Sequence, residues 1–191
     1  MELNNLYKQC RTFRKFTQKE IPTEDIDAIL QNLRYVHSGN NRQTVSYISI
    51  QGRELREAIA KEIHFAALLP RVLADPKENE QPTAYLILVG PKQHTRTIDI
   101  DTGIAAEYVV ESAFEKGIGS CMMLNYNAAK VDEILELPDE QSALMIIALG
   151  YPSHTSEAVE IDEDGSTAYT CDEQYHYRVP KKKLAQIAKK R

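Results

Sequence analysis

The chain has 191 residues, of which 42% are hydrophobic and 27% are charged, and its formal net charge is −5. This is ordinary globular composition, and a single domain over residues 1–191 is expected. The acidic balance argues against nucleic acid or an anionic membrane surface as a partner, because both favour a basic face. Three cysteines without a CxxC pair indicate neither a disulfide framework nor a zinc site.

The N-terminus, MELNNLYKQC, lacks the apolar core of a signal sequence. The longest apolar runs, at 85–89 and 143–149, are far shorter than the roughly 20 residues that span a bilayer. We therefore expect no membrane partner and a soluble protein of a reducing compartment, the cytoplasm.

Helical and strand patterns mix along the chain without a strict βαβ rhythm, which indicates an α/β or α+β fold with one sheet covered by helices. Predicted helices cover residues 2–10, 23–36, 53–74, 101–117 and 128–138. Pro70 predicts a break in the third helix, and Gly117 or Gly119 ends the fourth. Predicted strands cover residues 46–51, 84–90, 119–124 and 142–152. The apolar run at 84–90 predicts a buried central strand.

The segment 159–170, VEIDEDGSTAYT, reads as strand, turn and strand. A loop that starts at Glu160 has acids at its first, third and fifth places and Gly165 at the sixth, as a calcium loop does. Its twelfth place is Cys171, where a bidentate glutamate is required. The segment therefore predicts a hairpin turn at Asp164-Gly165 instead.

Other short motifs favour structural roles. The GIGS sequence at 117–120 follows a helix, whereas phosphate loops follow a strand, so we interpret it as a helix C-cap that enters a strand. The five histidines form no HxxxH or HxH pair, so they predict no metal site. Cys121 lies in an apolar strand and is expected in the core.

The stretch CRTFRKF, at 10–16, is a compact basic cluster in an acidic protein. Arg11 and Arg14, with the hydroxyl of Thr12 between them, suit a phosphate monoester. The same charges also suit an ordinary solvated helix end, and the cluster alone favours that second interpretation. The KKK run at 181–183 is similar, and the two segments reinforce each other only if folding brings them together.

Five segments, in order, resemble the nitroreductase family of FMN-dependent oxidoreductases along nearly the whole chain. They are Arg-Ser/Thr-x-Arg-x-Phe (Arg11, Thr12, Arg14, Phe16), Ser-x-x-Asn-x-Gln (Ser38, Asn41, Gln43), a long helix that runs into Gly-x-Gly-x-Cys (101–121), Leu-Gly-Tyr-Pro (149–152) and Val-Pro-Lys-Arg-x-Leu (179–184). The resemblance implies an α+β domain, an α/β sandwich with a central mixed sheet covered by helices. It also implies a homodimer with tightly bound FMN at the interface.

The resemblance further implies the residues that bind FMN. Near the phosphate and ribityl chain it places Arg11, Thr12 and Arg14, joined from the C-terminal segment by Lys181 or Lys182. Ser38, Asn41 and Gln43 would contact the flavin, with their loop coming from the partner subunit. The strand at 122–125 would run along the flavin edge near N5, through Met122, Met123, Leu124 and Asn125.

The implied activity is ping-pong hydride transfer, in which NAD(P)H reduces FMN and a nitroaromatic, quinone or similar small molecule then accepts the electrons. The cofactor carries the difficult chemistry, so no catalytic side chain is nominated. An alternative is a flavin-binding carrier or sensor with little turnover. A third interpretation is another flavin reaction, such as reductive dehalogenation or flavin fragmentation.

Two positions depart from the family pattern. Many members have an arginine immediately before Arg11, and this chain has Cys10 there. One positive phosphate ligand is therefore missing, which leaves Arg11, Arg14 and the lysines of the C-terminal segment. Some members have an acidic residue beside the flavin where this chain has Leu124, so substrate preference does not carry over.

Overall fold

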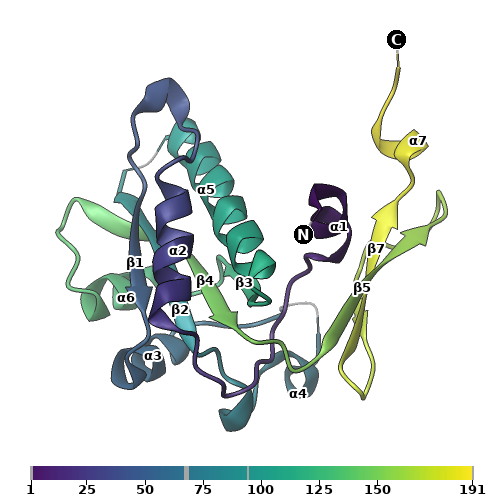
Figure 1. Ribbon diagram of the computed structural model, residues 1–191, viewed down its shortest axis with the longest axis horizontal. Coiled ribbons are helices and arrows are strands. Elements are labelled where there is room, and N and C mark those ends of the chain that lie inside the picture. The colour runs from purple at the N-terminus through teal and green to yellow at the C-terminus, as the bar shows by residue number, and fades with distance from the viewer. Residues whose placement is uncertain (1, 67–68, 94, 191) are drawn as a thin grey trace.

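The structure is a computed structural model that describes residues 2–66, 69–93 and 95–190, and it has an α+β architecture with two sheets (Figure 1). A four-stranded sheet has the order β1-β2-β4-β3, and a three-stranded sheet has the order β5-β7-β6. The strands are β1 (Ser46–Ile50), β2 (Ala84–Pro91), β3 (Gly119–Met123), β4 (Gln141–Gly150), β5 (Thr155–Ile161), β6 (Thr170–Cys171) and β7 (His176–Lys182). The helices are α1 (Leu3–Gln9), α2 (Thr23–Leu33), α3 (Arg53–Ala60), α4 (Arg71–Ala74), α5 (Arg96–Glu115), α6 (Ala128–Ile134) and α7 (Leu184–Ile187), with short 3-10 helices η1 (Gly39–Asn41) and η2 (Glu78–Glu80).

The strand β2 lies at the centre of the core. Its side chains alternate between two hydrophobic clusters, with Tyr85 and Ile87 in one and Leu86 and Leu88 in the other. The helices α2 and α5 pack on the side of Leu86 and Leu88, and α3 and α6 pack on the opposite side (Figure 1). Burial on both faces explains the continuous apolar run and confirms the predicted buried central strand.

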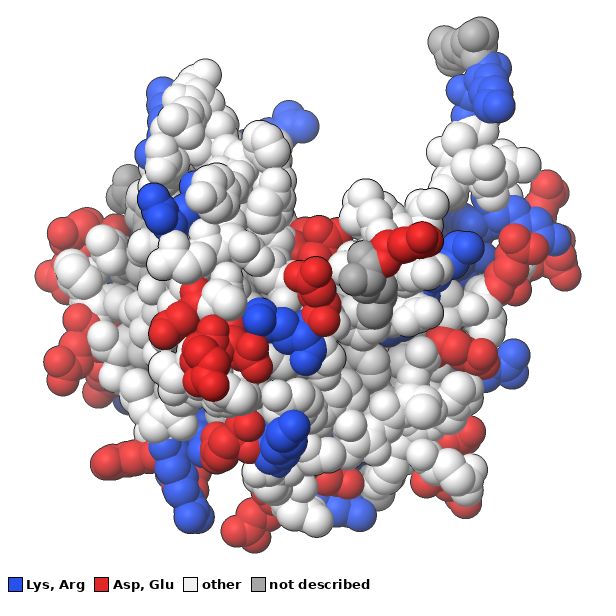
Figure 2. Space-filling model, viewed as in Figure 1, with Lys and Arg blue, Asp and Glu red and all other residues white. Residues whose placement is uncertain are grey.

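The predicted α+β fold, in which helices cover a central sheet, is confirmed. In the part of the chain that the structure describes, the pairs of the four-stranded sheet are all antiparallel. Mixed pairing occurs in the smaller sheet, where β7 pairs parallel to β5 and antiparallel to β6. Figure 2 shows acidic and basic side chains interspersed over one face, with the C-terminal segment standing clear of the rest of the molecule.

The prediction of a β-hairpin with its turn at Asp164-Gly165 is wrong. A turn is present, since the N–H of Gly165 donates to the carbonyl of Asp162 over 3.0 Å. However, β5 and β6 do not pair with each other, because β7 lies between them and pairs with both. No strand was predicted for residues 176–182, so the strand that lies between the other two was missed.

Two helix predictions also need correction at their ends. The helix predicted over 53–74 is two helices, and the first stops at Ala60, well before Pro70. The chain leaves the helix there because Ile63 bridges to Tyr126, and the N–H of His64 donates to the carbonyl of Asn125. The helix α5 begins at Arg96, before the predicted start at residue 101.

The predicted helix C-cap at GIGS is confirmed. Gly117 has a φ of 74°, a left-handed conformation that glycine adopts without steric cost. The N–H of Ile118 donates to the carbonyl of Ala113, as in a Schellman motif. The chain turns directly from α5 into β3, which carries the buried Cys121 into the core as expected.

The basic stretch at 10–16 is not a solvated helix end. The helix α1 ends at Gln9, and the stretch runs alongside the ends of β3 and β4. The N–H of Phe13 donates to the carbonyl of Ser120 over 2.8 Å, and the N–H of Thr17 donates to that of Tyr151 over 2.8 Å. Phe13 and Phe16 are buried in the core. These contacts fix the path of the backbone that carries both arginines.

Two glycines make room for these phenylalanines. Gly119 and Gly150 are partners across β3 and β4. A Cβ at Gly150 would lie 2.8 Å from Cβ and ring atoms of Phe16. A Cβ at Gly119 would lie 2.8 Å from the ring of Phe13 and 2.6 Å from Cγ of Pro152. The phenylalanines therefore pack directly on the sheet backbone.

Replacing Gly150 tests this packing. Gly150→Ala should lower the free energy of unfolding by about 1–3 kcal/mol, because the added methyl group overlaps Phe16. Gly103→Ala is the matched control, since nothing lies within 4 Å of a Cβ at that helical position, and it should be neutral or stabilising by up to about 1 kcal/mol. Urea unfolding of both variants gives the comparison. Equal stabilities would show that Phe16 moves aside at no cost.

Candidate functional site

A cavity of about 420 Å³ lies where the 10–16 stretch, α5, β3 and the smaller sheet meet, and we call it the basic pocket. Its volume falls within the range of small-molecule sites. It is lined by Cys10, Arg11, Thr12, Arg14, Glu107, Val110, Ser120, Met122, Tyr169, Val179 and Lys181. Folding therefore does bring the two basic segments of the sequence together.

The charges of the basic pocket suit an anion. Arg11, Arg14 and Lys181 are cationic, and Glu107 is the one acidic side chain among the residues described as lining the pocket. Burial raises the pKa of the Cys10 thiol to about 11, with a further contribution from Glu107. The thiol is therefore neutral at pH 7 and adds no negative charge to the pocket.

Both arginines have an N–H donor that makes no hydrogen bond within the described chain. The Nε atoms of Arg11 and Arg14 are buried and make no hydrogen bond within the described chain. Arg11 is anchored by its other end, because Nη2 donates to the carbonyl of Tyr7 over 2.6 Å. A buried donor without an acceptor costs about 1–3 kcal/mol. A ligand with several acceptor oxygens would relieve that cost.

Arg14 is held on several sides. Its guanidinium carbon lies 4.7 Å from the centre of the Tyr169 ring and 5.2 Å from that of Tyr177. Its backbone N–H donates to Nε2 of His154 over 2.9 Å. Because Nε2 accepts, the proton of His154 lies on Nδ1, which is 3.1 Å from the carbonyl oxygen of Thr155 and donates to it. The neutral imidazole thus fixes the backbone of Arg14.

The basic pocket collects five of the residues predicted for cofactor binding: Arg11, Thr12, Arg14, Met122 and Lys181. Side chains alternate between the two faces of a strand, so the residues that follow Met122 and Lys181 point away from the basic pocket. The side chain of Met123 is buried in the core, and Lys182 is exposed outside the pocket. Leu124 is 72% exposed and lines a separate cavity of about 480 Å³. Asn125 is exposed, and its carbonyl accepts the N–H of His64.

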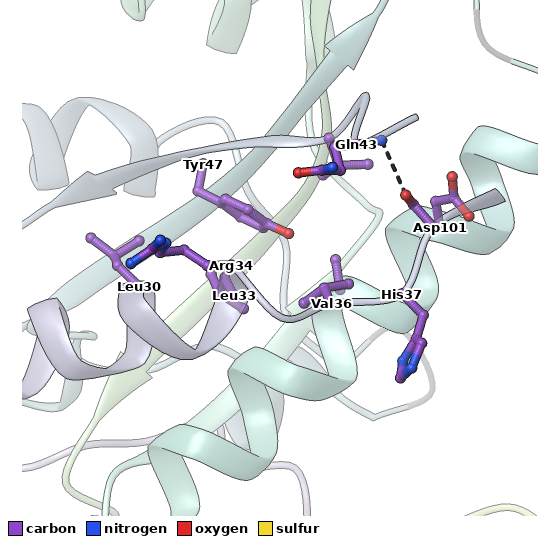
Figure 3. Close-up of a pocket in the computed structure, with 11 residues that line it drawn as sticks. Leu30, Leu33, Arg34, Val36, His37, Gln43, Tyr47 and Asp101 are labelled. Atoms are coloured by element: carbon purple, nitrogen blue, oxygen red, sulfur yellow. Dashed lines mark hydrogen bonds between the residues drawn. The ribbon is translucent and has the colours of Figure 1, made fainter. Parts of the chain in front are cut away.

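The predicted residues around η1 do not reach the basic pocket. Ser38 and Gln43 line a cavity of about 210 Å³ that also includes Tyr47 and Asp101 (Figure 3). The N–H of Gln43 donates to Oγ of Ser38 over 3.0 Å, and Asn41 is exposed beside them. The two cavities share no lining residue. Within one chain, these side chains and the basic pocket therefore form separate sites.

Sequence reasoning missed several residues of the basic pocket and its support: Glu107, Ser120, His154, Tyr169 and Tyr177. One of them, Tyr177, lies on an alternating strand pattern that the sequence contains. Tyr177, Val179 and Lys181 alternate along β7, so recognition of that strand would have placed them on one side. Nothing in the sequence indicated that His154 or Tyr169 would contact Arg14.

The sequence profile described as the nitroreductase family matches residues 7–151. This chain belongs to the nitroreductase family. The match covers the 10–16 stretch and the whole four-stranded sheet. It ends before the smaller sheet, so Tyr169, Tyr177 and Lys181 of this nitroreductase-family protein lie beyond the matched residues.

Relatives within the nitroreductase family have diverse names. An NADPH-flavin oxidoreductase of Vibrio harveyi is 27% identical to this chain. The aligned residues cover 77% of this chain and 64% of that protein. An iodotyrosine deiodinase of Thermotoga neapolitana is 24% identical over 78% of this chain and 88% of its own length. The solved structure of an FMN-dependent nitroreductase from Clostridium difficile R20291 covers 84% of this chain and 92% of its own, with 22% identity and a TM-score of 0.65.

Among residues 2–66, 69–93 and 95–190, no helix has the length and apolar character to cross a membrane. Over the same residues, no cluster of three or more histidine, cysteine, aspartate or glutamate side chains could hold a metal ion.

His154 makes the stability depend on pH. Burial lowers its pKa to about 4, from about 6.5 in the unfolded chain. Between these values the unfolded state binds a proton that the folded state does not, so the free energy of unfolding falls as the pH falls below 6.5. The loss should reach about 2 kcal/mol at pH 5 and about 3 kcal/mol at pH 4.

Urea unfolding at pH 7 and pH 5 measures this effect. In His154→Gln the amide oxygen can still accept the N–H of Arg14, but the side chain does not titrate. The variant should therefore lose less stability than the wild type between the two pH values. An identical loss in both proteins would show that the dependence arises elsewhere.

Proposed function

We propose that this chain is a single-domain, FMN-dependent oxidoreductase that uses NAD(P)H to reduce a nitroaromatic, a quinone or a similar small molecule. The observation that carries the proposal is the basic pocket, which joins the family-like opening stretch to a lysine of the C-terminal segment. Membership of the nitroreductase family and the similarity to an NADPH-flavin oxidoreductase support it.

The residues of the basic pocket fit the phosphate monoester of FMN. A dianion there would face Arg11, Arg14 and Lys181, whose charges it would largely neutralise. The buried Nε atoms of the two arginines offer N–H donors that have no other acceptor in the described chain. Thr12 and Ser120 add hydroxyl groups that can bond phosphate or ribityl oxygens.

The remaining lining residues suit the less charged parts of the cofactor. Glu107 can accept hydrogen bonds from ribityl hydroxyl groups, and it keeps the pocket from favouring a more highly charged anion. Met122 is 38% exposed at the β3 side of the pocket and offers an apolar contact. Bound FMN would supply the redox chemistry, by accepting a hydride from NAD(P)H and reducing the acceptor. The chain itself binds, orients and shields the cofactor.

A homodimer completes this proposal. The loop of Ser38, Asn41 and Gln43 can meet the flavin in the basic pocket only if it comes from a second subunit. Several large apolar side chains are more than half exposed in the single chain: Leu3, Tyr7, Tyr35, Ile100, Leu124, Leu184 and Ile187. Burial of such side chains is a usual driving force for association.

The first experiment is the absorbance spectrum of the purified protein. A yellow protein whose flavin absorbance is bleached by NADH or NADPH supports the proposed function. Bound FMN that neither nucleotide reduces would favour the alternative, a flavin-binding carrier or sensor. A colourless protein that cannot take up FMN would contradict both.

Single substitutions test the phosphate contacts. Arg11→Ala and Lys181→Ala should each weaken FMN binding by about 1.5–3 kcal/mol, because each removes a charge-assisted hydrogen bond. Lys182→Ala is the matched control, since this neighbouring lysine carries the same charge but lies outside the basic pocket. Fluorescence titration of flavin-depleted protein gives the three dissociation constants. Equal losses for the two lysine variants would show that only overall charge matters.

Mixed dimers test whether the site is shared between subunits. Arg11→Ala and Asn41→Ala homodimers should both bind FMN weakly. A mixed dimer holds one site with both substitutions and one site with neither, because each site takes Arg11 from one subunit and Asn41 from the other. Mixing the unfolded variants and refolding them should therefore restore tight sites. No recovery in mixed dimers isolated by two affinity tags would argue that each site lies within one chain.

A further inference from the structure

The guanidinium group of Arg14 lies over two tyrosine rings, one within the smaller sheet and one directly before a strand of that sheet. Tyr169 directly precedes β6, and Tyr177 lies within β7. The distances from the guanidinium carbon, 4.7 Å and 5.2 Å to the two ring centres, are within the range of cation–π contacts. The rings themselves are 6.5 Å apart and inclined by 36°. Both rings therefore contact the same cation.

A cation–π contact holds an arginine through its charge and uses none of its five N–H donors in hydrogen bonds. In agreement with this, Nε of Arg14 has no hydrogen-bond partner in the described chain. Arg11 differs, because its fixed position depends on the hydrogen bond from Nη2 to the carbonyl of Tyr7. Arg14 is thus held in place with its donors available.

His154 packs against one of these tyrosines and also contacts the backbone of Arg14. Tyr177 is fully buried, and its ring centre lies 4.6 Å from that of His154. His154 in turn accepts the backbone N–H of Arg14. The backbone and the side chain of Arg14 are therefore fixed by one connected group of three rings. An arginine that is already ordered loses less conformational entropy when it binds an anion.

We propose that Tyr169 and Tyr177 are positioning residues that pre-orient Arg14 toward the cofactor phosphate. They raise the affinity for the phosphate, because one ordered, partly desolvated guanidinium binds an anion more tightly than a mobile one. This inference rests on the proposed function, since it takes the phosphate of FMN as the ligand. It extends the site to two residues that lie beyond the family match at 7–151.

Variants of Tyr169 test the inference, because this ring is only partly buried whereas Tyr177 is a core residue. Tyr169→Phe keeps the ring and should retain the FMN affinity of the wild type. Tyr169→Leu removes the ring and should raise the dissociation constant of FMN roughly 3- to 30-fold. Riboflavin lacks the phosphate, so its affinity should change little in either variant.

A double-mutant cycle identifies the route of the effect. If Tyr169 acts through Arg14, Tyr169→Leu should cause no further loss of FMN affinity in an Arg14→Ala background. Fluorescence titrations of flavin-depleted, full-length protein give all the constants, and circular dichroism confirms that each variant is folded.

The outcomes separate the two proposals. A wild-type protein that does not bind FMN would overturn the proposed function and the inference together. A wild type that binds FMN, with a Tyr169→Leu variant that binds it equally well, would overturn only the inference. An equal loss for riboflavin and FMN, or a full additional loss in the Arg14→Ala background, would also overturn it.

Discussion

Phe16 lies against the backbone of Gly150, and Phe13 lies against that of Gly119, at the point where β3 and β4 pair. This contact is steric, and it tolerates little change because a sheet backbone cannot retreat from an added side chain. It anchors the 10–16 stretch at two points three residues apart. Arg14, between the two phenylalanines, and Arg11 and Thr12, before them, then line the basic pocket. The position of the charges thus follows from the packing of two apolar rings.

Electrostatics adds to this packing at short range only. The protein is acidic overall, yet three cations converge on one cavity. Charges separated by more than about 8–10 Å in solvent are largely screened at physiological ionic strength, so the net charge of −5 weighs little against a local cluster. His154 and Cys10 both stay neutral near pH 7 because burial disfavours their charged forms. The pocket therefore keeps a net positive charge, which the carboxylate of Glu107 reduces but does not cancel.

The sequence predicted the four-stranded sheet and its helices well because their patterns are local and periodic. The run at 84–90 was apolar throughout since β2 is buried on both faces. Of the smaller sheet, the sequence predicted strands only within 159–170. The strand β7 was missed because it contains Pro180 among charged residues. For the same reason Lys181 was expected in the site only through a family resemblance. Tyr169 and His154 were missed because their roles depend on contacts across the fold, which no local pattern records.

The parallel pairing of β5 with β7 also affects when the basic pocket can form. Parallel strands need a long connection, and here that connection contains Tyr169 and β6. A nascent chain emerges from the ribosome N-terminus first, so Arg11 and Arg14 are exposed long before their partners exist. The basic pocket cannot form without residues 169–181, because Tyr169, Val179 and Lys181 line it. If FMN binds there as proposed, its capture must wait until these residues have been synthesised and folded back onto the opening stretch.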